Sequence, residues 1–119
     1  IASVLKIAKD EDIRSAEISA IGAVGRAVFG LYDLEEQKYH SLTFVQPLEL
    51  VSLNGNLSRK DGEPYLHLHA AFADEKGAVI GGHLNEAVIS ATCEMFIKIF
   101  DIDMGRRISE QTGLNIFDI

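Results

Sequence analysis

Apolar and polar residues alternate with a period of two through most of this chain, and this pattern constrains its fold more than any other feature. Successive side chains of a β-strand point to opposite faces, so such alternation predicts strands with one buried face. A helix competes for residues 85–91, where the pattern is weaker. We therefore expect strands over residues 14–21, 27–31, 38–44, 48–58, 64–73, 87–102 and 114–119.

The residues between these segments predict how the strands are connected. Gly22 and Gly25 are expected to break the chain, Pro47 to mark a bend or a sheet edge, and residues 54–56 to form a β-bulge. Polar turns are expected at 60–63 and 74–77.

One short segment has a different period. Val4, Leu5 and Ala8 follow helical spacing, and an acidic run ends that helix at residues 10–12. The sum is one α+β domain over residues 1–119, a largely antiparallel β-sheet with one or two helices.

Length and composition place the chain among globular proteins. A chain of 119 residues with 47% hydrophobic residues can bury a core without disulfides, and its apolar runs are too short to cross a membrane. Cys93 is the only cysteine and is expected to be a buried thiol, which fits a reducing, cytoplasmic location. Because the chain starts with Ile1 inside a helical pattern, we expect residues to be missing ahead of it.

The charge balance argues against direct binding of nucleic acid. The net charge is −7, from 18 acidic and 11 basic residues, and no basic cluster exceeds two neighbouring residues. Proteins that bind DNA usually present a basic stripe, because neutralising phosphates supplies most of the affinity. We expect weak, non-specific DNA binding at most.

Three histidines form the strongest candidate site. His67 and His69 have the i, i+2 spacing that places both imidazoles on one face of a strand, and a turn can bring His83 beside them. Three neutral imidazoles with an open fourth position are typical of Zn²⁺ sites, so zinc or another divalent metal is the leading cofactor. The plainer alternatives are polar residues on an open sheet face and hydrogen-bonded core histidines. His40 has no such partner and is expected at the surface.

Neighbouring residues leave alternatives open. Glu86 lies three residues past His83 and is either an orienting group, a fourth ligand, a general base for metal-bound water, or a solvated turn residue. Gly81-Gly82 either cradles phosphate or, more simply, lets His83 approach the sheet. Arg26, beside Gly25, is expected to form a salt bridge, with an anion site as the alternative.

Several motifs together resemble the plant-and-prokaryote-conserved (PPC) domain family. They occur in the family's order over nearly the whole chain. The motifs are PLELVSLNGN at 47–56, HLH at 67–69 and GGHL at 81–84, with ISAIGAV at 18–24, DEKG at 74–77 and TGL at 112–114.

The resemblance implies an α+β domain that assembles as a homotrimer in prokaryotic members, with His67, His69 and His83 at the positions that hold a metal. The family usually has a further strand before the first helix, which this chain lacks. Its DNA-binding label comes largely from plant relatives, where an AT-hook precedes the domain and enters the minor groove. This sequence has no AT-hook, since residues 105–107 (GRR) are followed by Ile108.

These observations predict a non-enzymatic, trimeric domain with a three-histidine metal site, which carries the family's DNA-binding or regulatory label. The alternatives are a metal-dependent small-molecule binding or sensor domain, and a small zinc metalloenzyme. Acidic charge disfavours direct DNA binding, and the lack of an evident acid/base pair disfavours the enzyme.

Overall fold

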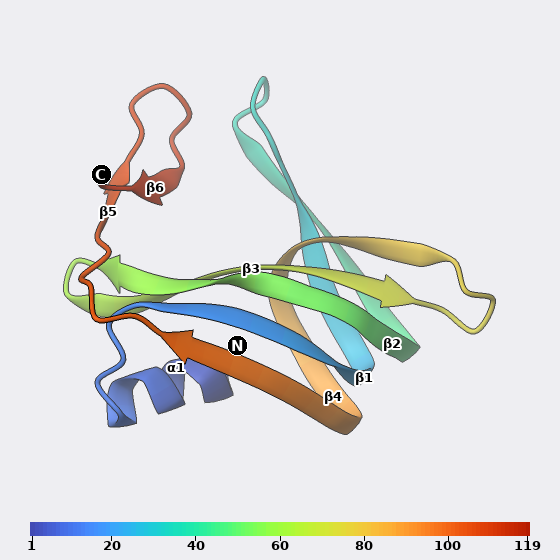
Figure 1. The fold of residues 1–119 in the computed structure, drawn as a ribbon. Coiled ribbons are helices and arrows are strands. Elements are labelled where there is room, and N and C mark those ends of the chain that lie inside the picture. Colours follow the sequence, from blue (N-terminus) through green and yellow to red (C-terminus); the bar gives the residue numbers. More distant parts are fainter.

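The computed structural model describes all 119 residues and contains one helix and six strands (Figure 1). Four long antiparallel strands close into a barrel in the order β1-β2-β3-β4, while β5 and β6 form a separate small sheet. The architecture is α+β and mostly antiparallel, as predicted. The elements are α1 (Ala2–Asp10), β1 (Ala16–Asp33), β2 (Lys38–Lys60), β3 (Glu63–Ala73), β4 (Val79–Ile99), β5 (Arg106–Ile108) and β6 (Asn115–Phe117).

The strands are longer than the sequence pattern predicted. The expectation that Gly22 and Gly25 break the chain was wrong, because β1 runs through both positions. Pro47, expected at a bend or a sheet edge, lies within β2 beside a register shift between Val45 and Leu48. Instead, the pairing register shifts just before Gly22 and again between Val24 and Arg26. A bulge absorbs an extra residue and bends a strand without ending it, so residues that break strands elsewhere are tolerated there.

The bulge expected at residues 54–56 was also misplaced. Gly55 pairs regularly with Ile18 of β1 and with Leu68 of β3, and the nearest irregularity lies between Leu50 and Ser52. A Cβ on Gly55 would lie 2.0 Å from the carbonyl oxygen of His67. Glycine at position 55 therefore allows β2 to approach β3 closely, and it does not form a bulge.

Turns and the helix follow the prediction more closely. Asp61 and Gly62, both with positive φ, close the β2–β3 hairpin, and the turn at 74–77 joins β3 to β4. Helix α1 buries Val4 and Ala8 against the barrel. Residues 85–91, for which a helix competed, belong to strand β4.

The core lies between α1 and the inner faces of the long strands, and contains 17 buried apolar residues. From β3 it takes Leu68, Ala70 and Phe72, the face that alternation predicted. Phe29 stacks on Phe72, with ring centroids 5.4 Å apart. Cys93 was expected to be buried, but it is only partly buried at the edge of this core, because β4 has few fully covered residues.

Much of the barrel surface is apolar and uncovered. Only 20 of 119 residues are buried, and the radius of gyration is 14.9 Å. A compact chain of this length is expected to have a radius of gyration of about 13.5 Å. Ile21, Val51 and Phe96 line one shallow hollow on the outside of the sheet, with exposed fractions of 55%, 45% and 78%. The only helix has nine residues, and no helix of the structure is long and apolar enough to cross a membrane.

Candidate metal centre

The strand register brings the three predicted histidines together. His69 of β3 is the direct antiparallel partner of His83 of β4, and His67 lies two residues earlier on the same strand. Leu68, between His67 and His69, points into the core, so the pleat turns both imidazoles outward. β4 pairs with β3 only over residues 79–83, so His83 lies at the last position where the two strands meet.

The three rings are close enough to share one ion. Their ligand nitrogens all lie within 4.8 Å of one another, and Nε2 of His67 is 3.3 Å from Nε2 of His69. Two nitrogens bound to one tetrahedral Zn²⁺ at its usual bond length are also about 3.3 Å apart. A hydrogen bond between the two rings has a similar length, so this distance fits both arrangements. The donor set fits a metal held by three imidazoles with one open position.

Local electrostatics favour the neutral form of two of these imidazoles, those of His67 and His83. Burial lowers the pKa of His67, and repulsion from His83, Arg106 and His69 lowers it further. Burial, followed by repulsion from His69, also lowers the pKa of His83. Because only a neutral imidazole can bind a metal, both shifts leave the ligand form available at neutral pH.

The backbone around His83 is tightly held. The Tyr39 hydroxyl donates to Oδ1 of Asn85 at 2.5 Å and lies 3.1 Å from the carbonyl oxygen of His83. Burial raises the pKa of Tyr39, while its hydrogen bond to Asn85 opposes that shift. A Cβ on Gly82 would lie 2.5 Å from the carbonyl oxygen of Gly30, so this glycine lets β4 approach β1 closely.

The strand pairing decides one of the open alternatives, and an ion pair bears on another. Gly81 and Gly82 lie within β4 and pair with β3, so they do not form a phosphate-cradling loop. Glu86 forms an ion pair with Arg26, the salt bridge expected for that arginine. The Glu86 carboxylate is not among the ligand atoms that gather at the three histidines. Its predicted role at the metal therefore stays a prediction.

His40 is exposed at the β1–β2 hairpin, as predicted, but it does have partners. Its Nε2 lies 3.2 Å from the Glu36 carboxylate, and Asp33 completes a second group of potential ligands. Asp33 already accepts two backbone N–H groups of the turn at 2.9 Å, from Glu35 and Glu36. These contacts account for the group as a hydrogen-bonded turn.

Sequence reasoning missed the role of Arg106, which appeared only as one of two neighbouring basic residues. Its guanidinium donates to Oγ of Ser58 and Oδ1 of Asn56, both at 2.7 Å. The same group lies over the rings of Tyr65 and Phe117, 4.7 and 4.4 Å from their centroids. No carboxylate forms an ion pair with this guanidinium. Burial lowers the pKa of Arg106. The side chain attaches the β5–β6 sheet to β2 and leaves a positive charge near His67.

A cavity of about 530 Å³ opens onto the three histidines, and we call it the histidine cavity. The β1–β2 hairpin forms one wall, and the segment between β5 and β6 forms the other. Figure 1 shows both rising from the same side of β3. The rest of the lining contains no acidic or basic residue. It consists of Gly30, Leu31, Tyr32, Tyr39, Tyr65, Gly82, Gly113, Leu114, Asn115 and Ile116.

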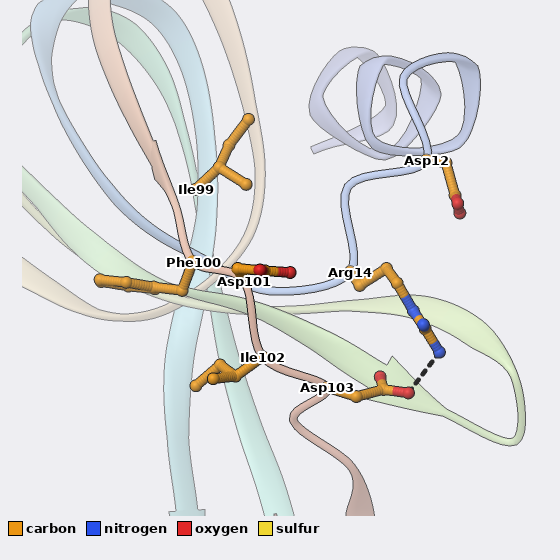
Figure 2. A pocket seen from close by; sticks show the side chains of 7 residues that line it. All are labelled: Asp12, Arg14, Ile99, Phe100, Asp101, Ile102 and Asp103. Carbon is orange, nitrogen blue, oxygen red and sulfur yellow. Dashed lines mark hydrogen bonds and ion pairs between the residues drawn. The ribbon is translucent and has the colours of Figure 1, made fainter.

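A second hollow, of about 370 Å³, lies at the end of β4 (Figure 2). Three aspartates and three apolar side chains line it, and its one cation, Arg14, is paired with Asp103. Both partners of this pair are more than half exposed. The hollow contains no histidine or cysteine, and its charges are explained by a solvated ion pair, so we assign it no chemistry.

Comparison with known proteins agrees with the family resemblance. A family model described as the Plants and Prokaryotes Conserved (PCC) domain matches residues 1–101. No curated protein sequence matches the chain.

Several solved structures share the fold. A metal-containing protein from Archaeoglobus fulgidus is 39% identical, and the match covers 98% of this chain and 83% of that one, with a TM-score of 0.92. A plant- and prokaryote-conserved protein from Pyrococcus horikoshii is 31% identical over 99% and 82% of the two chains, with a TM-score of 0.91. A candidate DNA-binding protein from Bacteroides thetaiotaomicron is 27% identical over 98% and 82%, with a TM-score of 0.96.

Proposed function

The chain belongs to the Plants and Prokaryotes Conserved (PCC) domain family, and we propose that it is a non-enzymatic member that binds one divalent metal ion, with zinc the first candidate, through His67, His69 and His83. The observation that carries this proposal is the gathering of all three imidazoles, whose ligand nitrogens lie within 4.8 Å of one another. When bound, the ion would supply a Lewis-acidic position open to water or to a ligand.

The surroundings of the histidines favour binding over catalysis. No carboxylate lines the histidine cavity, and Glu86, the residue considered as a general base, is ion-paired with Arg26. General acid–base chemistry needs a titratable group within hydrogen-bond reach of the reacting atoms. The relative from Archaeoglobus fulgidus, named as a metal-containing protein, adds support for the metal.

The proposal is tested by elemental analysis of protein purified without a metal-binding tag. After incubation with zinc and removal of the excess, we expect about one zinc ion per chain, as one three-histidine site would hold. A chain that takes up no zinc, cobalt or nickel under these conditions would overturn the proposal.

We propose that the domain assembles as a homotrimer, as the family resemblance implies. The exposed apolar hollow at Ile21, Val51 and Phe96 supports this, because such patches on monomers usually mark contact surfaces. Light scattering is expected to give three times the 13.0 kDa chain mass. Phe96→Asp should shift the mass toward the monomer, whereas Leu34→Asp, at an exposed hairpin tip, should leave it unchanged. A wild-type monomer at micromolar concentration would contradict the assembly.

DNA binding is expected to be weak and non-specific, although a structural relative is a candidate DNA-binding protein. The net charge of −7 repels phosphate, and Arg14, Arg26, Arg59 and Arg107 are each engaged with a carboxylate. Fluorescence anisotropy with a labelled duplex in physiological salt should give a Kd no tighter than about 10⁻⁵ M, within the range of non-specific binders. A nanomolar Kd would contradict this expectation and indicate that DNA is the ligand.

A further inference from the structure

We propose that the histidine cavity is a binding site for a small organic carboxylate with an apolar or aromatic body. The acid group would approach the metal position, and the body would lie between the two hairpin walls. This inference rests on the proposed function, because it assigns the open position of that metal to a ligand class.

The shape of the cavity supports a small molecule. Its volume of about 530 Å³ falls in the range of small-molecule sites in proteins. The Tyr32 hydroxyl lies 3.6 Å from where a Cβ on Gly113 would be, so the two walls approach each other at this point. A ligand reaching the histidines would therefore be flanked by both hairpins.

The charge of the cavity favours an anion. None of the 18 acidic residues of this acidic chain lines it. The three histidines would hold a divalent cation there, and Arg106, with no carboxylate partner, contributes positive charge from behind Tyr65. An anion in the histidine cavity thus meets no acidic side chain in the lining and lies near positive charge.

The walls favour an apolar body on that anion. Leu31, Leu114 and Ile116 supply aliphatic surface, and the rings of Tyr32, Tyr39 and Tyr65 supply aromatic surface. Rings bury large areas and stack on flat ligands, which stabilises binding without further charges.

A carboxylate fits better than a phosphate. Phosphate sites usually combine arginine or lysine clusters with a nest of backbone N–H groups. The lining contains no lysine or arginine, and Gly82, which would suit such a nest, lies within a paired strand.

The test uses the intact protein loaded with Co²⁺, whose visible spectrum reports on the open metal position. Benzoate is expected to change the spectrum saturably, with a Kd near or below 1 mM. Benzamide, its neutral counterpart, should bind at least tenfold more weakly, and inorganic phosphate should not compete at equal concentration. Calorimetry provides an independent Kd for benzoate.

Two matched variants locate the binding. Leu114→Asp places a negative charge in one wall and should weaken benzoate at least tenfold without reducing bound Co²⁺. Leu34→Asp adds the same charge at an exposed hairpin tip outside the cavity and should leave benzoate affinity unchanged.

The outcomes separate the two proposals. If wild type takes up no Co²⁺, both the metal site and this inference fail. If Co²⁺ binds but benzoate leaves the spectrum unchanged, benzamide or phosphate binds equally well, or Leu114→Asp has no effect, the metal site stands and the carboxylate site is overturned.

Discussion

Replacing His69 with alanine is expected to reduce bound zinc to below about a tenth of the wild-type amount, because two protein ligands remain where three imidazoles are needed. The same loss is expected for His67→Ala and for His83→Ala, since each removes one imidazole of the same group. Elemental analysis after equilibration with zinc and desalting measures the occupancy. Circular dichroism establishes that each variant is folded.

His40→Ala is the matched control, because it removes a histidine from the hairpin group with Asp33 and Glu36. It should leave the zinc content unchanged. Equal zinc in wild type and in all three site variants would show that the ion binds elsewhere and that the cluster is an ordinary set of sheet histidines.

Bound zinc should also respond to pH in a direction that the structure determines. Burial lowers the pKa of His67 and of His83, so both stay neutral below the ordinary histidine pKa of about 6.5. Zinc should therefore be lost as the pH falls below about 6.5, because protonation of either ring removes a ligand. In the metal-free protein, groups with a lowered folded-state pKa contribute full stability above about pH 6.5 and lose it as the pH falls further. Thermal melts of the metal-free protein at pH 7.5 and 5.5 measure this loss.

Gly55→Ala is expected to destabilise the fold by about 3 kcal/mol, at the upper end of the usual cost of overpacking. The added Cβ would lie 2.0 Å from the His67 carbonyl oxygen and 2.8 Å from the Leu68 Cα. Both are backbone atoms of β3, so the strands must separate. A loss of this size should lower the melting temperature by roughly 10 °C, which urea unfolding and thermal melts both measure.

Gly25→Ala provides the comparison, since it also changes a strand glycine to alanine. The nearest atom to its added Cβ is Cβ of Ser90 at 3.6 Å, an ordinary contact. Its effect should stay below about 1 kcal/mol. If the two variants unfold at the same urea concentration, the close approach of β2 to β3 does not limit what position 55 accepts.

The sequence by itself determined the features that depend on neighbouring residues. Alternation in β3 predicted that Leu68 and Phe72 face the core and that His67 and His69 share the opposite face, because the pleat of a strand is a local property. The turns at 60–63 and 74–77 were predictable for the same reason, since glycine and polar residues determine the backbone of a turn locally.

Only the tertiary structure decided the features that depend on strand pairing. Register alone places His83 opposite His69, and two register shifts let β1 continue through Gly22 and Gly25. The position of a bulge depends on both strands of a pair, so the pattern of one strand does not locate it. Glu86 pairs with Arg26, 60 residues earlier, although His83 lies only three residues away.

The histidine cavity likewise combines residues that the sequence identifies with walls that only the folded chain brings together. The sequence identified the three histidines of its floor, but its walls come from a hairpin of the barrel and from a C-terminal segment that Arg106 attaches to β2. Contacts between residues 50 positions apart leave no periodic signal in the sequence, so they become visible only when the chain is folded.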